Sequence, residues 1–318
     1  MKPMKIGIAG AGTMSSSMAL IFMEQGFDTV LHVRSEASMQ RVRNNISASL
    51  PTDVQAGKIT QQQADAMLDH LHFSTDMQVF ADCDLIVESI IEDLAIKQDY
   101  WEQVSQVVSD ACVLATNTSG LSINRICERV KGKHRFLGMH WFNPPHLIPL
   151  IEIIRGDETD DRSVQLVRDI ALQIGKKPVL CRKDAAGFIA NRIQYAILRE
   201  CMEIVERGIA SVEDVDAVMK YSLGFRYAAL GPFEVADFGG LDIFYHISEY
   251  LSPDLSRAEH PQKLIADCYA AGDYGVKTGK GFYDYSDGKD KQAIARRDRL
   301  FAQLYQTLYG AESKEDAE

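Results

Sequence analysis

The chain has 318 residues, which is more than one hydrophobic core usually organises, so two domains are expected. Its formal net charge of −11 argues against nucleic acid or an anionic membrane as a partner, although a phosphorylated small molecule held by local dipoles is allowed. Six cysteines without a CxxC pair indicate neither a metal site nor disulfides, and a folded motif about five residues from the N-terminus leaves no room for a signal peptide, so we expect a cytoplasmic protein.

The first half of the chain alternates strand-like and helix-like segments, a pattern typical of a parallel sheet wrapped by helices. Residues 4–9 and 28–33 are predicted strands, with a helix at 13–25 between them. Residues 35–73 are polar and helical, which predicts a helical hairpin protruding from the sheet. The further predictions are strands at 84–87, 112–115, 136–140, 150–154 and 178–181, and a helix at 161–174.

Past residue 184 the pattern becomes helical, with amphipathic helices predicted at 189–207 and 212–221. We therefore expect a doubly wound α/β domain at 1–185 that carries the hairpin, followed by an all-helical domain at 186–318. The apolar surface of the helical domain exceeds what a lobe of this size buries alone. This predicts a domain for substrate binding and homodimerisation, ending in the charged tail AESKEDAE.

A glycine motif follows the first predicted strand. Residues 6–15 read IGIAGAGTMS, with the glycines between a strand and a helix. A tight turn followed by the free N–H groups of a helix start can hold a pyrophosphate, so the motif predicts a Rossmann-type dinucleotide site. Ser15 replaces the usual third glycine, and its hydroxyl could cap the helix or bind phosphate. The predicted binding residues are Gly10, Gly12, Thr13, Met14 and Ser15.

The residues after the second predicted strand bear on the choice between NAD and NADP. NAD enzymes usually have an acid there that binds the ribose hydroxyls, whereas this chain has Val33, Arg34 and Ser35. Without a carboxylate the repulsion of a 2′-phosphate is absent, and Arg34 could pair with that phosphate. The sequence therefore predicts NAD(P), with a preference for NADP. The alternative is a solvated loop arginine.

A histidine and a carboxylate lie twelve residues apart in GMHWFNPPHLIPLIE, which covers residues 138–152. Prolines between His140 and Glu152 rule out a single helix that would join them on one face. A strand, a proline turn and a returning strand could bring both side chains to the same cleft. The pair then has the composition of a histidine base with its orienting acid. The alternative is a structural histidine beside an unrelated glutamate.

Four motifs together carry a resemblance to a known family. They are NTSGLSI, GMHWFNPP with LIE after it, GFIANR, and GVKTGKGFYDY. In order and spacing they resemble the L-3-hydroxyacyl-CoA dehydrogenase family over about residues 4–285. The resemblance implies NAD(P)-dependent, reversible oxidation of an L-3-hydroxyacyl-CoA, such as short-chain 3-hydroxybutyryl-CoA, to the 3-oxo compound.

The resemblance also implies roles for individual residues. His140 would be the base and Glu152 its partner, because imidazole titrates near the working pH and can accept the hydroxyl proton. Ser119 and Asn191 would surround the substrate oxygens. Asn117 follows a predicted strand at the cofactor crevice. The segment VESIIEDLAIK puts Glu92 and Lys97 where the family contacts the nicotinamide ribose and nearby groups of the cofactor.

One departure leaves the substrate open. In LGFRYAALGP, Arg226 stands where acyl-CoA enzymes are expected to have a shorter apolar or His-Pro-containing loop. This segment looks more like the branch with L-gulonate 3-dehydrogenase, lambda-crystallin, carnitine dehydrogenase and a pyridine-carboxylate dehydrogenase. An arginine could bind the carboxylate of a small free hydroxy acid, or it could form a surface salt bridge. A non-catalytic, crystallin-like cofactor-binding protein is the further alternative.

Overall fold

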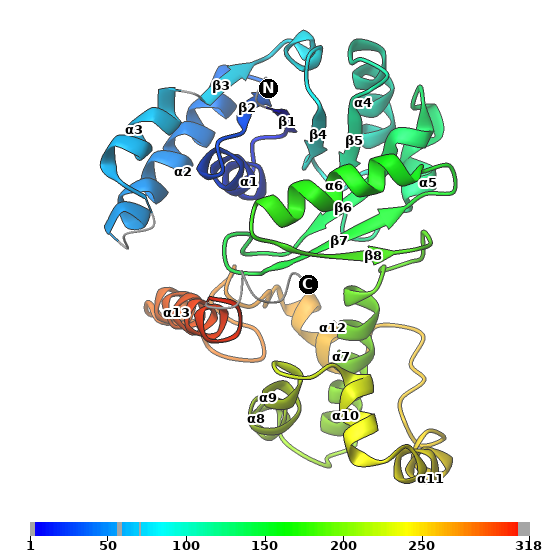
Figure 1. The fold of residues 1–318 in the computed structure, drawn as a ribbon. Helices are drawn as coiled ribbons and strands as arrows, with labels where there is room; N and C mark the ends of the chain where they lie inside the picture. Colours follow the sequence, from blue (N-terminus) through cyan, green and yellow to red (C-terminus); the bar gives the residue numbers. More distant parts are fainter. Residues whose placement is uncertain (1–3, 56–58, 70, 311–318) are drawn as a thin grey trace. The chain divides into compact units, whose positions relative to one another are not determined.

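The computed structural model describes residues 4–55, 59–69 and 71–310. The chain divides into two compact units, residues 1–191 and 192–318 (Figure 1). The first unit is a Rossmann-like sheet with helices and the second is helical, so the predicted fold class is confirmed.

An eight-stranded sheet forms the centre of the first unit, in the order β3-β2-β1-β4-β5-β6-β7-β8. All neighbouring strands are parallel except β6 and β7, which are antiparallel. The strands are β1 Lys5–Ala9, β2 Asp28–His32, β3 Leu71–Ser74, β4 Leu85–Glu88, β5 Val113–Thr116, β6 Phe136–Trp141, β7 Leu150–Arg155 and β8 Lys177–Cys181.

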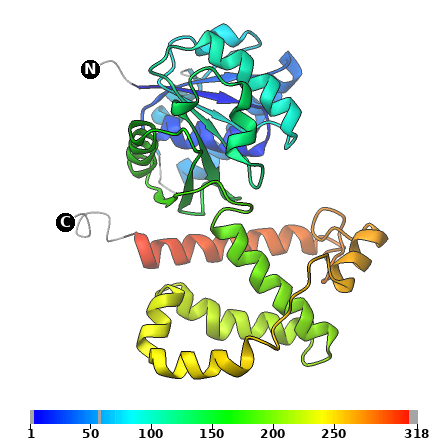
Figure 2. The same ribbon diagram turned by 90° about the vertical axis from the view of Figure 1, so that its right-hand side faces the viewer.

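Helices cover both faces of this sheet (Figure 2). One apolar cluster joins Ile6 and Ile8 of β1 to Phe22 of α1 and Ile170 of α6, and a second joins Ala9 to Trp101 of α4. The central strands are mostly apolar because both of their faces are buried. The helices are α1 Thr13–Glu24, α2 Glu36–Gln55, α3 Gln61–Asp69, α4 Leu94–Val107, α5 Ile123–Ile126 and α6 Asp161–Gln173, with short 3₁₀ turns at Met77–Phe80, Cys127–Arg129 and Lys133–Arg135.

The predicted helical hairpin corresponds to α2 and α3, but the prediction that helix extends to residue 73 is wrong. The chain returns to the sheet as β3, in which Leu71 is buried and pairs with Thr29 of β2. Four residues are too few to show strand alternation in a sequence, and it is pairing with β2 that makes them a strand. Residues 56–58 and 70 of this stretch lie outside the described residues.

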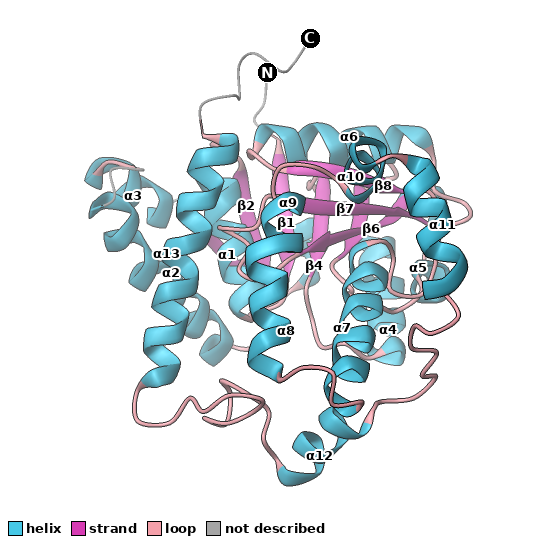
Figure 3. Cartoon of the chain, turned by 90° about the horizontal axis from the view of Figure 1, so that it is seen from below, coloured by secondary structure: helices cyan, strands magenta, loops and turns pink. Residues whose placement is uncertain are grey.

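The second unit is built from helices joined by loops (Figure 3). They are α7 Ala190–Glu206, which begins in the first unit, α8 Val212–Val218, a π-helical turn Met219–Leu223, α9 Gly224–Tyr227, α10 Pro232–Gly239, α11 Leu241–Leu251, α12 Lys263–Ala271 and α13 Lys289–Tyr309. Within residues 192–310, Met202 is the one apolar side chain that is buried, whereas Phe233 and Phe238 are 87% and 81% exposed. The tail at 311–318 lies outside the described residues. No described helix is both long and apolar enough to cross a membrane.

Candidate active site

The antiparallel pair β6 and β7 brings the histidine and the glutamate together. His140 lies directly opposite Glu152 in the strand register, and the predicted arrangement of strand, proline turn and returning strand is confirmed. The turn contains a cis peptide bond between Asn143 and Pro144. Nδ1 of His140 and Oε2 of Glu152 are 2.8 Å apart, and both side chains are buried.

Glu152 is hydrogen-bonded through both of its oxygens. Oε1 accepts the backbone N–H groups of Ile189 and Ala190, at 3.0 and 2.8 Å. Burial alone would raise the pKa of Glu152, but the hydrogen bonds from His140 and from these two N–H groups outweigh it and lower the pKa. The carboxylate is therefore held ionised. An ionised carboxylate only accepts, so Nδ1 of His140 carries a proton, and Nε2 is the nitrogen available to take a proton from a substrate.

Two aromatic rings surround the imidazole of His140. The centroid of Phe142 lies 4.4 Å away and that of Phe188 lies 5.7 Å away. Phe188 has a backbone φ of 51°, which is uncommon for a residue other than glycine and marks a constrained turn before α7. The rings limit the orientations open to the imidazole.

Ser119 and Asn191 are also brought together. Nδ2 of Asn191 donates to the carbonyl oxygen of Ser119 at 2.7 Å. The hydroxyl of Ser119 makes no hydrogen bond within the described part of the chain, and the residue is exposed. Asn191 follows Ala190, whose N–H binds Glu152. One continuous series of contacts in the first unit thus links all four predicted catalytic residues.

A buried ion pair is connected to Ser119 through Glu92. Nζ of Lys97 is 2.5 Å from Oε1 of Glu88 and 3.3 Å from Oε2 of Glu92. Glu88 also accepts hydrogen bonds from Trp101 and Thr116 at 3.2 and 2.8 Å, and from the N–H of Ile90 at 2.8 Å. The contact of Lys97 with the cofactor stays a prediction; its side chain is 1% exposed and forms ion pairs with Glu88 and Glu92.

Glu92 links Lys97 to Ser119. The Glu92 side chain is 45% exposed and accepts from the hydroxyl of Thr118 and from the N–H of Ser119, the latter at 3.0 Å. These bonds hold the start of the loop at residues 119–122, which reads SGLS. The predicted site residues Glu92, Lys97 and Ser119 thus form one network.

The glycine turn has the shape expected for a phosphate site. Gly10 has a φ of +123°, and a Cβ there would lie 2.4 Å from the carbonyl oxygen of Ser89, so only glycine fits. Helix α1 begins after Gly12 with no side-chain cap and no acidic residue in its first turn. Its first N–H groups can therefore donate hydrogen bonds to an anion at the positive end of the helix dipole, and a pyrophosphate is such an anion. Thr13 is exposed and Met14 is half-buried.

Ser15 and Asn117 were predicted to bind the cofactor, and both roles stay predictions. Ser15 is fully buried beneath Gly10, does not cap α1, and its hydroxyl has no hydrogen-bond partner among the described residues. The Asn117 amide accepts the N–H of Trp141 at 2.8 Å and donates to the hydroxyl of Ser89 at 3.3 Å. Asn117 therefore fixes the end of β6, next to His140.

The end of β2 presents polar and basic groups. Arg34 is exposed, and the Ser35 hydroxyl accepts the N–H of Ser38 at 3.3 Å, which caps the start of α2. From α2, Nε of Arg41 donates to the carbonyl of Ala11 in the glycine turn at 3.1 Å. Sequence reasoning missed Arg41, because it lies within a polar helix and no motif marks it.

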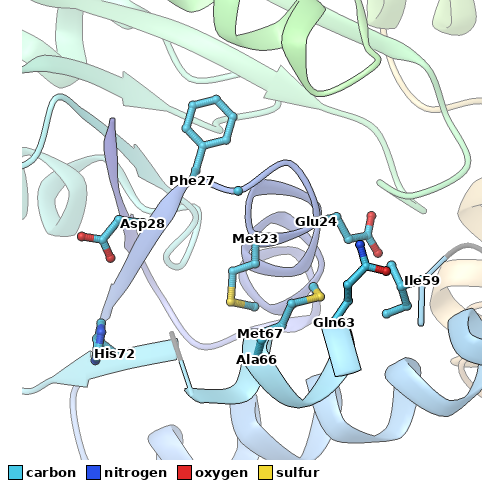
Figure 4. Close-up of a pocket in the computed structure, with 10 residues that line it drawn as sticks. Met23, Glu24, Phe27, Asp28, Ile59, Gln63, Ala66, Met67 and His72 are labelled. Atoms are coloured by element: carbon cyan, nitrogen blue, oxygen red, sulfur yellow. The ribbon is translucent and has the colours of Figure 1, made fainter. Parts of the chain in front are cut away.

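A cavity in the first unit is remote from this chemistry. It has a volume of about 560 Å³ and is lined by Phe27, Asp28, Met67, His72 and neighbouring residues (Figure 4). Asp28 begins β2, so the cavity lies at the amino end of that strand, whereas ligands of such sheets bind at carboxyl ends. The six cysteines are free thiols, and no group of three or more His, Cys, Asp or Glu side chains in the described residues could hold a metal ion.

Arg226 belongs to α9 in the second unit. Its side chain is exposed, and Nη2 donates to the hydroxyl of Ser222 one turn earlier, at 3.1 Å. No ion pair of Arg226 occurs within the described residues. The guanidinium therefore keeps donors for a further partner.

Comparisons with known proteins agree with this architecture. Residues 5–185 match the NAD binding domain of 3-hydroxyacyl-CoA dehydrogenase, and residues 187–285 match the C-terminal domain of the same enzymes. A probable 3-hydroxybutyryl-CoA dehydrogenase from Deinococcus radiodurans is 38% identical over 89% of this chain and 100% of its own length. A 5-formyl-3-hydroxy-2-methylpyridine 4-carboxylate 5-dehydrogenase from Mesorhizobium japonicum is 32% identical over 96% of this chain and 99% of its own.

Solved structures show the same two similarities. The structure of a 5-formyl-3-hydroxy-2-methylpyridine 4-carboxylic acid 5-dehydrogenase, described as an NAD⁺-dependent dismutase, covers 97% of this chain and 99% of its own with a TM-score of 0.88 and 32% identity. (S)-3-hydroxybutyryl-CoA dehydrogenase from Ralstonia eutropha covers 90% of this chain and 100% of its own, with a TM-score of 0.76 and 31% identity.

Proposed function

Because the chain belongs to the 3-hydroxyacyl-CoA dehydrogenase family and is a dehydrogenase with an NAD-binding domain, we propose that it reversibly oxidises a short-chain L-3-hydroxyacyl-CoA to the 3-oxoacyl-CoA. The observation that carries this proposal is the buried contact of 2.8 Å between His140 and Glu152. Oxidation of a secondary alcohol requires a base that takes the hydroxyl proton while hydride leaves the same carbon. When bound, the nicotinamide supplies the hydride acceptor.

In this proposal Nε2 of His140 takes the substrate proton and Glu152 stabilises the imidazolium that results. The two N–H groups on Glu152 keep that carboxylate fixed and ionised, so it need not reorganise during proton transfer. The Ser119 hydroxyl, together with Asn191, orients the substrate oxygen. The Asn191 amide also holds the Ser119 carbonyl, which fixes the loop that presents the hydroxyl. Glu92 and Lys97 support the same loop.

The cofactor would lie with its pyrophosphate on the N-terminus of α1, held by backbone groups of Gly10, Gly12 and the first turn of the helix. We propose that NADP is preferred. Support comes from the exposed Arg34, from Arg41 on the glycine turn, and from the absence of a carboxylate at Val33, whose side chain is buried. A 2′-phosphate would receive charge-assisted hydrogen bonds from these arginines.

A small free hydroxy acid is the second candidate substrate. The pyridine-carboxylate enzyme matches 96% of this chain, whereas the Deinococcus acyl-CoA enzyme matches 89%. The match to the C-terminal domain of 3-hydroxyacyl-CoA dehydrogenase ends at residue 285, and helix α13 lies beyond the end of that match. We propose that Arg226, which keeps donors beyond its bond to Ser222, would bind the carboxylate of such an acid.

The helical unit is proposed to serve in substrate binding and to form a homodimer. Of its described residues only Met202 is a buried apolar side chain, and α11 exposes Leu241, Ile243, Phe244 and Tyr245. An apolar surface of this extent needs a partner that covers it. A second copy of the chain supplies the same surface.

A turnover screen tests the substrate proposal. Acetoacetyl-CoA and a set of free 3-oxo and 3-hydroxy acids are each assayed with NAD(H) and NADP(H). The acyl-CoA proposal predicts turnover of acetoacetyl-CoA that the Arg226→Met variant retains. The free-acid candidate predicts turnover of an acid, with a KM that Arg226→Met raises about 10- to 100-fold through lost charged hydrogen bonds. No turnover of either class would contradict the proposed activity.

A further inference from the structure

The turn between β6 and β7 has few backbone N–H groups that could donate hydrogen bonds to its own carbonyl groups. Pro144, Pro145 and Pro149 supply no N–H donors, and the cis bond at Pro144 turns the chain sharply. Within the turn, the carbonyl of Pro144 accepts from the N–H groups of Leu147 and Ile148, both at 3.1 Å. The carbonyl of Pro149 accepts from the N–H of Lys177 at 2.9 Å. The carbonyls of Pro145 and Ile148 need other donors.

Lys176 supplies these donors from the loop that precedes β8. Its Nζ donates to the carbonyl of Pro145 and, at 2.8 Å, to that of Ile148. The residue is 6% exposed, and its ammonium group lies 5.6 Å from the ring centroid of Trp141. Burial lowers the pKa of Lys176 to about 8, with Glu24 opposing the shift. Burying a lysine ammonium group costs free energy. Among the described residues the acceptors of its hydrogen bonds are main-chain carbonyls, which indicates that Lys176 serves to hold the turn.

The same turn borders the proposed base. Phe142 opens it, two residues after His140, and places its ring 4.4 Å from the imidazole. The turn also joins the two strands that set His140 opposite Glu152. On the other side of β6, Asn117 holds the N–H of Trp141. The strand end that carries His140 is therefore fixed by Asn117 on one side and by the lysine-held turn on the other.

We propose that Lys176 is a positioning residue for catalysis: by holding the carbonyls of Pro145 and Ile148 it fixes the turn at 142–149, and thereby the imidazole of His140 against Phe142 and Glu152. This inference rests on the proposed role of His140 as the base. It assigns to Lys176 no contact with substrate or cofactor.

The test replaces Lys176 by methionine, which keeps the length and apolar stem and removes all donors. Lys176→Arg is the conservative variant, and Lys177→Met is the matched control, because Lys177 is the exposed neighbour of the same type. We expect Lys176→Met to lower kcat about 10- to 100-fold, as small misplacements of a catalytic group do. The pH dependence of kcat should change, and NADH affinity should not. Lys176→Arg should recover part of kcat, and Lys177→Met should match the wild type.

A purely structural lysine would give a different result. Lys176→Met would then lower the melting temperature while the folded protein kept the wild-type kcat and pH profile, and this outcome would overturn the proposal. If Lys176→Met does not fold, Lys176→Gln, which keeps two donors without the charge, replaces it beside Lys176→Arg. The glutamine side chain ends one bond short of the lysine Nζ and carries no charge, so wild-type kcat and pH profile in Lys176→Gln would likewise overturn the proposal. Full activity of His140→Ala would instead refute the proposed base, so the two failures are distinguishable.

Discussion

The two units of this chain bury their residues in opposite ways. In the first unit buried charges are matched within the chain, as with Lys97 and Glu88 or His140 and Glu152, and apolar clusters lie on both faces of the sheet. In the second unit Met202 is the one buried apolar side chain of residues 192–310. The first unit thus contains the contacts of the proposed reaction centre, whereas the second exposes apolar surface that the proposed dimer would cover. Chemistry and assembly are therefore expected to respond to different substitutions.

The largest effect on the first unit is expected from Lys97→Met. Removal of the cation leaves the carboxylate of Glu88 buried without a charge partner, which costs about 3–5 kcal/mol in the free energy of unfolding. Urea denaturation of both proteins measures this difference. Lys133→Met is the control, because its partner Glu158 is 3.6 Å away and 64% exposed, and such surface pairs contribute about 0–1 kcal/mol. Equal losses in the free energy of unfolding would show that breaking the buried pair of Lys97 and Glu88 costs no more than breaking an exposed pair.

Phe233→Asp tests whether the exposed apolar surface of the second unit forms the proposed dimer contact. If the exposed face of the helical unit meets a second copy, each buried phenylalanine contributes about 1.5–3 kcal/mol, and twofold symmetry places the substitution in the interface twice. Light scattering should then show a dimer for the wild type and a monomer for the variant. NADH binding serves as the internal control and should persist. A wild-type protein that is monomeric at all concentrations would refute the proposed assembly.

Glu152→Gln removes the negative charge of the residue that is paired with His140 and keeps the size of its side chain. Loss of a charged hydrogen bond should weaken the stabilisation of the transition state by about 1.5–3 kcal/mol, and kcat should fall accordingly. The acid limb of the pH–rate profile should move to lower pH, because the imidazolium loses its charge partner. The pKa of Glu152 is lowered, so its carboxylate stabilises the folded state above its usual pKa of 4.5, and this contribution is lost as the pH falls below that value. The stability difference between wild type and variant should therefore shrink in acid. A pH–rate profile identical to the wild type would count against the pairing.

Arg34→Ala tests the cofactor preference and has the smallest expected effect. It should weaken NADPH binding by about 1–3 kcal/mol and leave NADH binding nearly unchanged, since only NADPH carries the 2′-phosphate. Fluorescence titration of both cofactors measures this, and Arg41→Ala should act in the same direction. Equal losses for the two cofactors would place Arg34 outside the phosphate site.

Much of the first unit could be predicted because its signals are local. The glycine turn and the spacing of His140 and Glu152 around the prolines are each readable within a short segment. What could not be predicted depends on residues distant in sequence. Strand β3 exists only through its pairing with β2, Arg41 reaches Ala11 from a polar helix, and Lys176 reaches Pro145 across 31 positions. The ion pair of Lys97 with Glu88 was likewise hidden: both residues lie in VESIIEDLAIK, but the sequence does not show that their side chains meet in the interior.

The central claim is that His140 is the base, and His140→Ala tests it most directly. Turnover is measured on the substrate class that the screen identifies, and NADH affinity is measured by titration of the same folded protein. The account predicts a fall in turnover of about 10²- to 10⁴-fold with cofactor affinity nearly unchanged, because loss of a general base acts on the chemical step. Turnover at the wild-type rate in a properly folded His140→Ala protein would contradict it.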